Sequence, residues 1–345
     1  MPYGYNGNVL HVDLTDGAWS VEHPDEAFYR RYLGGGAMAS YYLLREMPAR
    51  CDAFGPDNVL VFAPTVMVGV PASGMVRFTV AAKSPLTGAY GEAEAGGFWG
   101  AELKFAGFDA VVIKGRAPEP VYLWIHDGEV ELRPAGHLTG LLSDQAQDAI
   151  HRELGDTRVR IAQTGPAGER RVRFACVVNN LKHFNGRTGM GAVMASKNLR
   201  AVAVRGRGKL EFADPDEIKR LAKWFVDQGG HVLTDLGSAN LVRGLDAGGI
   251  LPTRNFISGS FEGADAISGE RMRDTILVKG EGCYACTVRC KRVVAAESPY
   301  KVDPRFGGPE YETLGSFGSC CGVSDLVAIC RANQLCGAYV ADTIS

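Results

Sequence analysis

Apolar and polar positions alternate through the first 208 residues and predict a strand-rich domain. From Val9 to Val21 the alternation surrounds Asp16-Gly17, a dipeptide typical of hairpin turns. A small-residue stretch at 91–97 predicts a loop rather than a strand. Further strands are predicted at 59–63, 76–82, 110–114, 121–125, 129–133, 159–162, 172–178 and 199–204.

Helical spacing of apolar residues becomes dominant after a glycine- and arginine-rich linker at 205–208. We therefore predict an α+β protein, with a strand-rich domain at 1–208 followed by a helical domain at 209–345. The last helix ends six residues before Ser345, with no polar tail, which suggests a truncated chain. Helices are predicted at 24–33, 37–45, 98–105, 144–154, 215–227, 233–247 and 325–339.

Three cysteines at C-x₂-C-x₃-C spacing are the strongest chemical signal in the sequence. They are Cys283, Cys286 and Cys290, and we expect them in a loop between helical segments. Closely spaced thiolates are typical ligands of an iron–sulfur cluster. A structural zinc site and unliganded thiols remain alternatives, although a four-cysteine zinc site would normally bring a second C-x₂-C pair, which this sequence lacks.

Two glycine-rich stretches and several charged residues form weaker patterns. The stretch at 91–97 carries Glu92 and Glu94, which suit a hard cation, and its backbone amides suit an anion. The stretch at 185–191 lacks both the Walker A ending and G-x-G-x-x-G spacing. Arg77 could bind phosphate, and Glu310 or Glu312 could accept a proton. Each of these features alone is better explained as an ordinary loop or surface.

Composition excludes several classes of protein. A net charge of −2 gives no electrostatic argument for binding nucleic acid or an anionic membrane. The nine cysteines follow no regular framework, and the N-terminus resembles no secretory signal, so we expect a reducing, cytoplasmic compartment. The longest apolar run, 59–70, is too short to span a bilayer.

Taken together, the motifs resemble the tungsten-containing aldehyde:ferredoxin oxidoreductase family. The cysteine motif matches, and six other segments follow the family order over essentially the whole chain. These segments lie at 77–88, 95–100, 102–107, 186–194, 196–199 and 309–314.

The resemblance implies a tungsten or molybdenum bis-pterin centre, a bridging Mg²⁺ and one [4Fe–4S] cluster. It implies a β-rich pterin-binding domain followed by helical domains, and a length nearly twice that of this chain. The fourth cluster cysteine and an active-site His would then lie outside it, and we expect the chain alone to be inactive.

The implied activity is oxidation of aldehydes to carboxylic acids, with electrons passing to ferredoxin or an Fe–S electron-transfer subunit in a homo- or hetero-oligomer. One alternative is the catalytic subunit of a tungsten benzoyl-CoA reductase. Another is a non-catalytic Fe–S or zinc-binding protein.

By position, the resemblance implies roles for individual residues. Glu312 matches the active-site carboxylate, and we expect it to be buried with a raised pKa. Glu94 departs from the Asn of better-known archaeal members, and in the last family motif, D-x-x-G-L-D, only Asp342 remains. The cofactor-binding set is Arg77, Glu94, Gly96, His183, Phe184, Gly186, Arg187 and Asp342.

Overall fold

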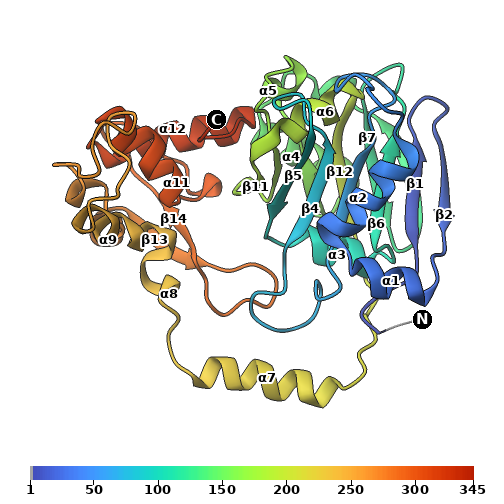
Figure 1. The fold of residues 1–345 in the computed structure, drawn as a ribbon, viewed down its shortest axis with the longest axis horizontal. Helices are drawn as coiled ribbons and strands as arrows, with labels where there is room; N and C mark the ends of the chain where they lie inside the picture. Colours follow the sequence, from blue (N-terminus) through green and yellow to red (C-terminus); the bar gives the residue numbers. More distant parts are fainter. Residues whose placement is uncertain (1–2) are drawn as a thin grey trace. The chain divides into compact units, whose positions relative to one another are not determined.

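The computed structural model describes residues 3–345 and divides them into two compact units (Figure 1). Unit 1 contains the chain up to Ala222 and the short segment Tyr339–Asp342. Unit 2 contains Lys223–Ala338 and Thr343–Ser345. A late return of the chain therefore brings Asp342 into the first unit.

The first sheet of unit 1 has six strands in the order β2-β1-β6-β3-β4-β5. β1 and β2 form the predicted antiparallel hairpin, while β1 and β6 are parallel. Helices α1 (Glu26–Tyr32) and α2 (Gly35–Glu46) pack on one face of this sheet. The strands are β1 (Val9–Asp13), β2 (Ala18–Glu22), β3 (Leu60–Pro64), β4 (Phe78–Lys83), β5 (Tyr90–Ala95) and β6 (Ala110–Lys114).

The second sheet of unit 1 also has six strands, in the order β11-β10-β9-β12-β7-β8. Helix α4 (Ser143–Leu154) packs on one face, through Ala146 and Ile150. The strands are β7 (Val121–His126), β8 (Glu129–Pro134), β9 (Arg160–Gln163), β10 (Val177–Asn179), β11 (His183–Asn185) and β12 (Leu199–Arg205).

A single apolar core joins the two sheets through helices α3 (Trp99–Phe105) and α6 (Met190–Ser196). Trp99 is fully buried in this core, and its indole nitrogen donates to the carbonyl of Val202 at 2.9 Å. This bond satisfies the one polar group of a large buried ring. The remaining short helices of unit 1 are η1 (Gly136–Leu138), α5 (Pro166–Glu169) and η2 (Arg187–Gly189).

Unit 2 is built mainly from short helices around a separate apolar core that includes Ile267, Leu314 and Ile329. Helix α7 (Pro215–Asp227) crosses the division between the units. No helix within residues 3–345 is long and apolar enough to cross a membrane. The other elements are α8 (Leu233–Leu236), η3 (Gly237–Asn240), α9 (Leu241–Ala247), η4 (Asp265–Ile267), α10 (Gly269–Thr275), β13 (Leu277–Glu281), β14 (Lys291–Val294), η5 (Pro304–Phe306), α11 (Tyr311–Thr313), η6 (Leu314–Gly318), η7 (Ser319–Cys321) and α12 (Leu326–Tyr339).

The predicted α+β class is confirmed, with two six-stranded sheets in unit 1 and mainly helices in unit 2. Four local predictions are wrong. Most of the expected loop at 91–97 is strand β5, and the expected strand at 172–178 shortens to Val177–Asn179. The expected helix at 233–247 is interrupted at Gly237, whose φ is +63°. The cysteine motif joins two strands, β13 and β14, rather than two helices.

Candidate functional site

The strand ends that carry Arg77 and Gly96 adjoin each other in the first sheet. β4 begins at Phe78, β5 ends at Ala95, and these two residues are paired in register. Arg77 therefore precedes one strand at the point where Gly96 follows the other. Glu94 is the second-last residue of β5 and pairs with Thr79 of β4. The structure thus brings together three of the predicted cofactor-binding residues.

The hairpin of β10 and β11 lies against β5 and carries two more of them. Successive residues of a strand face opposite sides, so His183 and Asn185 share one face and Phe184 takes the other. The Asn185 side-chain nitrogen donates to the carbonyl of Ala93 at 2.9 Å, which identifies the face that meets β5. Phe184 instead packs against the apolar cluster of Cys176, Val178 and Val340.

Asp342 reaches the same region through the segment that returns to unit 1. The Cys176 amide donates to the Val340 carbonyl, and the Asp342 amide donates to the Phe174 carbonyl, each at 3.1 Å. A Cβ placed on Gly186 would lie 3.2 Å from the Asp342 carboxylate. The structure therefore places Asp342 against the glycine of the second predicted pterin loop.

The exposed charges at this site suit an anionic group. Arg77 and Arg187 are both exposed, and neither guanidinium has a hydrogen bond or an ion pair with another residue of the described range 3–345. Guanidinium groups bind phosphate through paired, charge-assisted hydrogen bonds. The exposed Glu94 carboxylate suits a hard cation such as Mg²⁺. These residues therefore fit a phosphate-bearing pterin accompanied by a divalent cation.

The three motif cysteines are presented by the loop of a single hairpin. All three side chains are partly buried, and the Cys286 amide donates to the Cys283 carbonyl at 3.2 Å. Cys290 immediately precedes β14. Closely spaced thiols of this kind are typical cluster ligands. Within residues 3–345, no three His, Cys, Asp or Glu side chains converge as they would around one metal ion.

A buried arginine holds the base of the cysteine hairpin. The Arg292 guanidinium donates to the backbone carbonyls of Asp235, Arg289 and Cys290. A Cβ on Gly280 would lie 2.7 Å from a terminal nitrogen of this guanidinium, so the glycine in β13 leaves it room. The sequence indicated only a basic residue near the motif, and its structural role depends on contacts distant in sequence.

Charged neighbours also surround Cys290. Burial raises the pKa of its thiol, the Glu310 carboxylate raises it further, and Lys291 opposes both effects. The Lys291 ammonium is itself ion-paired with Glu310. Cys330, a fully buried cysteine of unit 2, lies in the apolar core, where burial raises the pKa of its thiol to about 12.

Glu312 lies in the short helix α11, and its side chain is exposed. Burial of this carboxylate was expected from the sequence, and that expectation is wrong for the described chain. The helix instead turns Thr313 inward, which leaves Glu312 on the outer side. Burial and the nearby Glu312 carboxylate together raise the pKa of Tyr311. Glu312 has no side-chain partner within the described part of the chain, whereas Glu310 is held by Lys291.

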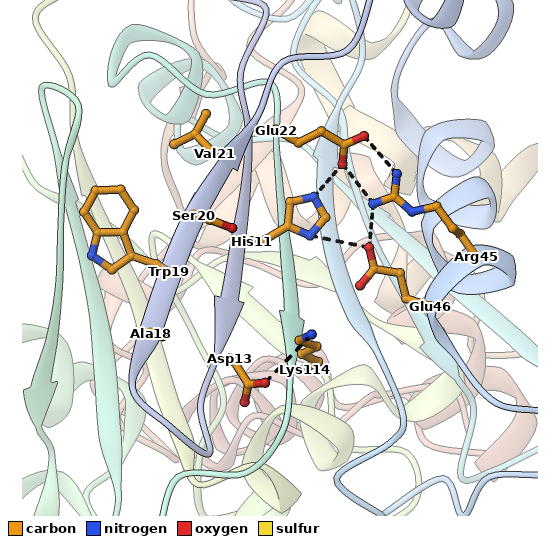
Figure 2. Close-up of a pocket in the computed structure, with 10 residues that line it drawn as sticks. All are labelled: His11, Asp13, Ala18, Trp19, Ser20, Val21, Glu22, Arg45, Glu46 and Lys114. Carbon is orange, nitrogen blue, oxygen red and sulfur yellow. Dashed lines mark hydrogen bonds and ion pairs between the residues drawn. The ribbon is translucent and has the colours of Figure 1, made fainter.

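A separate hollow of about 400 Å³ lies at the β2 edge of the first sheet. Figure 2 shows the His11 ring between two carboxylates, 2.8 Å from Glu22 and 3.5 Å from Glu46. Arg45 contacts both carboxylates and holds the pKa of Glu22 below its usual range. The charges here pair with one another, and none of the predicted site residues lines the hollow.

Sequence comparison identifies a family for both parts of the chain. The profile described as the aldehyde ferredoxin oxidoreductase N-terminal domain matches residues 9–206. The profile described as domains 2 and 3 of aldehyde ferredoxin oxidoreductase matches residues 217–345. The two matches account for most of the chain.

Individual relatives agree with these matches. A tungsten-containing aldehyde ferredoxin oxidoreductase of Pyrococcus abyssi is 43% identical, over 99% of this chain and 57% of its own length. The Pyrococcus furiosus protein of the same name is 38% identical over the same shares. This chain therefore spans about half the length of the curated relatives it matches.

A solved structure is similar in fold. It is the active-site complex BamBC of benzoyl coenzyme A reductase with 1,5-dienoyl-CoA, which matches with a TM-score of 0.84 and 30% identity. The match covers 99% of this chain and 54% of that one.

Proposed function

Because this chain belongs to the aldehyde ferredoxin oxidoreductase family, we propose that its protein oxidises aldehydes to carboxylic acids. The reaction would use a tungsten bis-pterin centre, with molybdenum as the alternative metal, and a [4Fe–4S] cluster. Electrons would leave through the cluster to ferredoxin or an Fe–S subunit. The observation that carries this proposal is 43% identity with a tungsten-containing relative over 99% of the chain.

The pterin site proposed for unit 1 rests on complementary charge. Arg77 and Arg187 would bind phosphate oxygens, and Asp342 would accept hydrogen bonds beside Gly186. Glu94 and the backbone around Gly96, His183 and Phe184 would hold Mg²⁺ and the pterin edge. The metal would supply the redox chemistry, while these residues orient the cofactor and neutralise its charge.

The cluster site proposed for unit 2 uses Cys283, Cys286 and Cys290 as ligands, with a fourth ligand from elsewhere. Three basic residues, Arg289, Lys291 and Arg292, lie beside these thiolates in the sequence. Positive charge near a cluster favours its more negative, reduced form, which suits a group that accepts electrons.

Glu312 is the proposed proton acceptor, because aldehyde oxidation releases protons together with electrons. Its carboxylate has no partner within residues 3–345, so it is available to exchange protons with solvent or substrate. Glu310 is a poorer candidate, since its ion pair with Lys291 stabilises the charged form and fixes its position.

We also propose that function divides near residue 208. Residues 1–208 would form the pterin-binding domain, and residues 209–345 the domain that carries the cluster cysteines. Independent expression of residues 1–208 tests this division. Cooperative unfolding of that fragment is expected, and a fragment without a melting transition would contradict it.

The second candidate function is reduction of an aromatic thioester, as in the catalytic subunit of a tungsten benzoyl-CoA reductase. The similarity of fold at a TM-score of 0.84 favours this candidate. Its identity of 30% is lower than the 38–43% shared with aldehyde oxidoreductases, so aldehyde oxidation is the better supported activity.

One experiment separates these candidates. The protein, carrying the whole family architecture, is purified anaerobically and analysed for W, Mo, Fe and Zn. Its activity is then measured with a panel of aldehydes and with benzoyl-CoA. We expect tungsten, iron and aldehyde-dependent reduction of ferredoxin. Activity on benzoyl-CoA alone would favour the second candidate, and zinc without tungsten or iron would indicate a non-catalytic metal protein.

A further inference from the structure

Two fully buried asparagines connect the strands of the proposed pterin site. The Asn179 side-chain nitrogen donates to the carbonyls of Gly96 at 3.1 Å and His183 at 3.2 Å. The Asn185 side-chain nitrogen donates to the carbonyls of Phe78 at 3.3 Å and Ala93 at 2.9 Å. We call Asn179 and Asn185 the asparagine pair.

The hairpin geometry explains why both asparagines point the same way. In the β10–β11 register Asn179 pairs with His183, and Asn185 pairs with Val177. Val177 and Asn179 are two residues apart on one strand, so both cross-strand pairs share a face. The turn residues Asn180 and Leu181 both have positive φ, 52° and 61°, as a tight hairpin turn requires.

The carbonyls that the pair holds belong to three separate stretches of chain. Phe78 follows Arg77, Ala93 precedes Glu94, and Gly96 and His183 are themselves proposed cofactor contacts. The asparagine pair therefore links the start of β4, the end of β5 and the start of β11. Its bonds are to backbone, so they fix the spacing of these stretches whatever side chains the stretches carry.

Both side-chain oxygens of the pair are buried and have no hydrogen-bond donor within residues 3–345. The Asn179 oxygen lies against Gly97, where a Cβ would approach it to 2.2 Å and where φ is +100°. A buried acceptor without a donor reduces stability. Stability alone therefore does not explain why asparagines occupy these two positions. Their side-chain nitrogens, however, donate to the backbone of the proposed site.

We infer that Asn179 and Asn185 are positioning residues that set the separation of the two pterin-binding loops before the cofactor binds. This inference rests on the proposed function. The ligand would be an anionic, phosphate-bearing pterin, and its phosphates would need Arg77 and Arg187 at a fixed spacing. Loops held in place beforehand lose less conformational freedom on binding, which increases affinity.

Asn58 provides a matched control in the same unit. It is also fully buried, and its side-chain nitrogen donates to the carbonyls of Ala53 at 2.7 Å and Lys83 at 3.0 Å. Lys83 ends β4, whereas Phe78 begins it, so Asn58 acts at the opposite end of that strand. Replacement of Asn58 should disturb unit 1 without moving the pterin-binding loops.

The test compares Asn179→Leu, Asn185→Leu and Asn58→Leu in the holoprotein from cells supplied with limiting tungstate. Tungsten per folded protein is measured alongside the melting temperature. We expect Asn179→Leu and Asn185→Leu each to lower the tungsten content at least about fivefold, which corresponds to a loss of about 1 kcal/mol in the free energy of cofactor binding. Asn58→Leu should lower the melting temperature and keep its tungsten. Equal tungsten content in all three variants would overturn the inference.

A second measurement does not depend on the cofactor. In apoprotein, amide hydrogen exchange at 90–97 and 183–189 should accelerate in the pair variants and not in Asn58→Leu. If Asn179→Leu fails to fold, Asn179→Asp, which keeps the shape of the side chain, replaces it in both measurements. Wild-type protein without tungsten would contradict the proposed function. Unchanged exchange in these loops would contradict the positioning role itself.

Discussion

Replacement of Arg292 by Met should release the cysteine hairpin. Arg292 is buried, and its guanidinium donates to the carbonyls of Asp235, Arg289 and Cys290. Methionine keeps an unbranched apolar stem but has no hydrogen-bond donor, so these three carbonyls lose the same partner at once. Two of them belong to the loop that carries the motif cysteines, so that loop should become more mobile.

The expected magnitude follows from two opposing contributions. A hydrogen bond to a charged group contributes about 1.5–3 kcal/mol, so three such bonds would give roughly 5–9 kcal/mol if they were additive. Burial lowers the pKa of Arg292, which indicates that the buried charge itself is costly. Removing this charge offsets part of the loss, and we expect a net destabilisation of about 2–4 kcal/mol.

Three measurements test this expectation. The first is urea unfolding, which gives the free energy directly. The second is the rate at which an alkylating reagent modifies Cys283, Cys286 and Cys290 in the apoprotein. The third is iron per protein in the holoprotein. Faster alkylation and less iron are expected together, because both depend on the same loop.

Arg292→Lys separates charge from geometry. Lysine keeps the positive charge but cannot donate to three carbonyls in the planar geometry of a guanidinium. It should therefore show most of the loss seen with Met. If Arg292→Met left stability, alkylation and iron content at wild-type values, the role assigned to this arginine would be wrong.

Three further predictions concern other residues. Arg77→Ala should reduce tungsten content in the holoprotein, because a charge-assisted contact to phosphate is lost; unchanged tungsten and pterin occupancy would refute the assignment. Glu312→Gln should lower turnover by roughly two to four orders of magnitude with W and Fe intact, the scale of a general base. Near-normal turnover there, with an inactive Glu310→Gln, would transfer the role to Glu310. Lys104→Met should destabilise unit 1 by about 3–5 kcal/mol in thermal or urea unfolding. The reason is that the buried Asp109 carboxylate loses its cation, the Lys104 ammonium 4.0 Å away. Adding Asp109→Asn to the Lys104→Met variant should recover part of the lost stability.

The sequence predicted elements whose hydrophobic pattern is strong. The hairpin at Asp16-Gly17 and helix α7 both formed where alternation or helical spacing was clear. Strand β5 was missed because its inward positions are Gly91, Ala93 and Ala95, which carry too little apolar surface to signal a strand. Its pairing with β4 determines its structure, and that pairing is not visible locally.

The same distinction applies to the candidate sites. Residues within a motif, such as the three cysteines, were identifiable from their spacing. Asn179 and Arg292 act through hydrogen bonds to carbonyls distant in sequence, so no local pattern marks them. A weak signal existed at Asn179 and Asn180, two neighbouring amides at the end of an apolar strand. Polar residues in that position often interact with backbone groups.

Both candidate sites use the same physical arrangement, a hairpin whose backbone carbonyls accept hydrogen bonds from a buried side chain. In unit 1 the donors are Asn179 and Asn185, and in unit 2 the donor is Arg292. Since these bonds hold only the backbone, the exposed side chains of each loop are not needed to maintain its shape. Glu94 is such an exposed side chain, so the charge that it would bring to the proposed cofactor can vary without altering the loop that presents it.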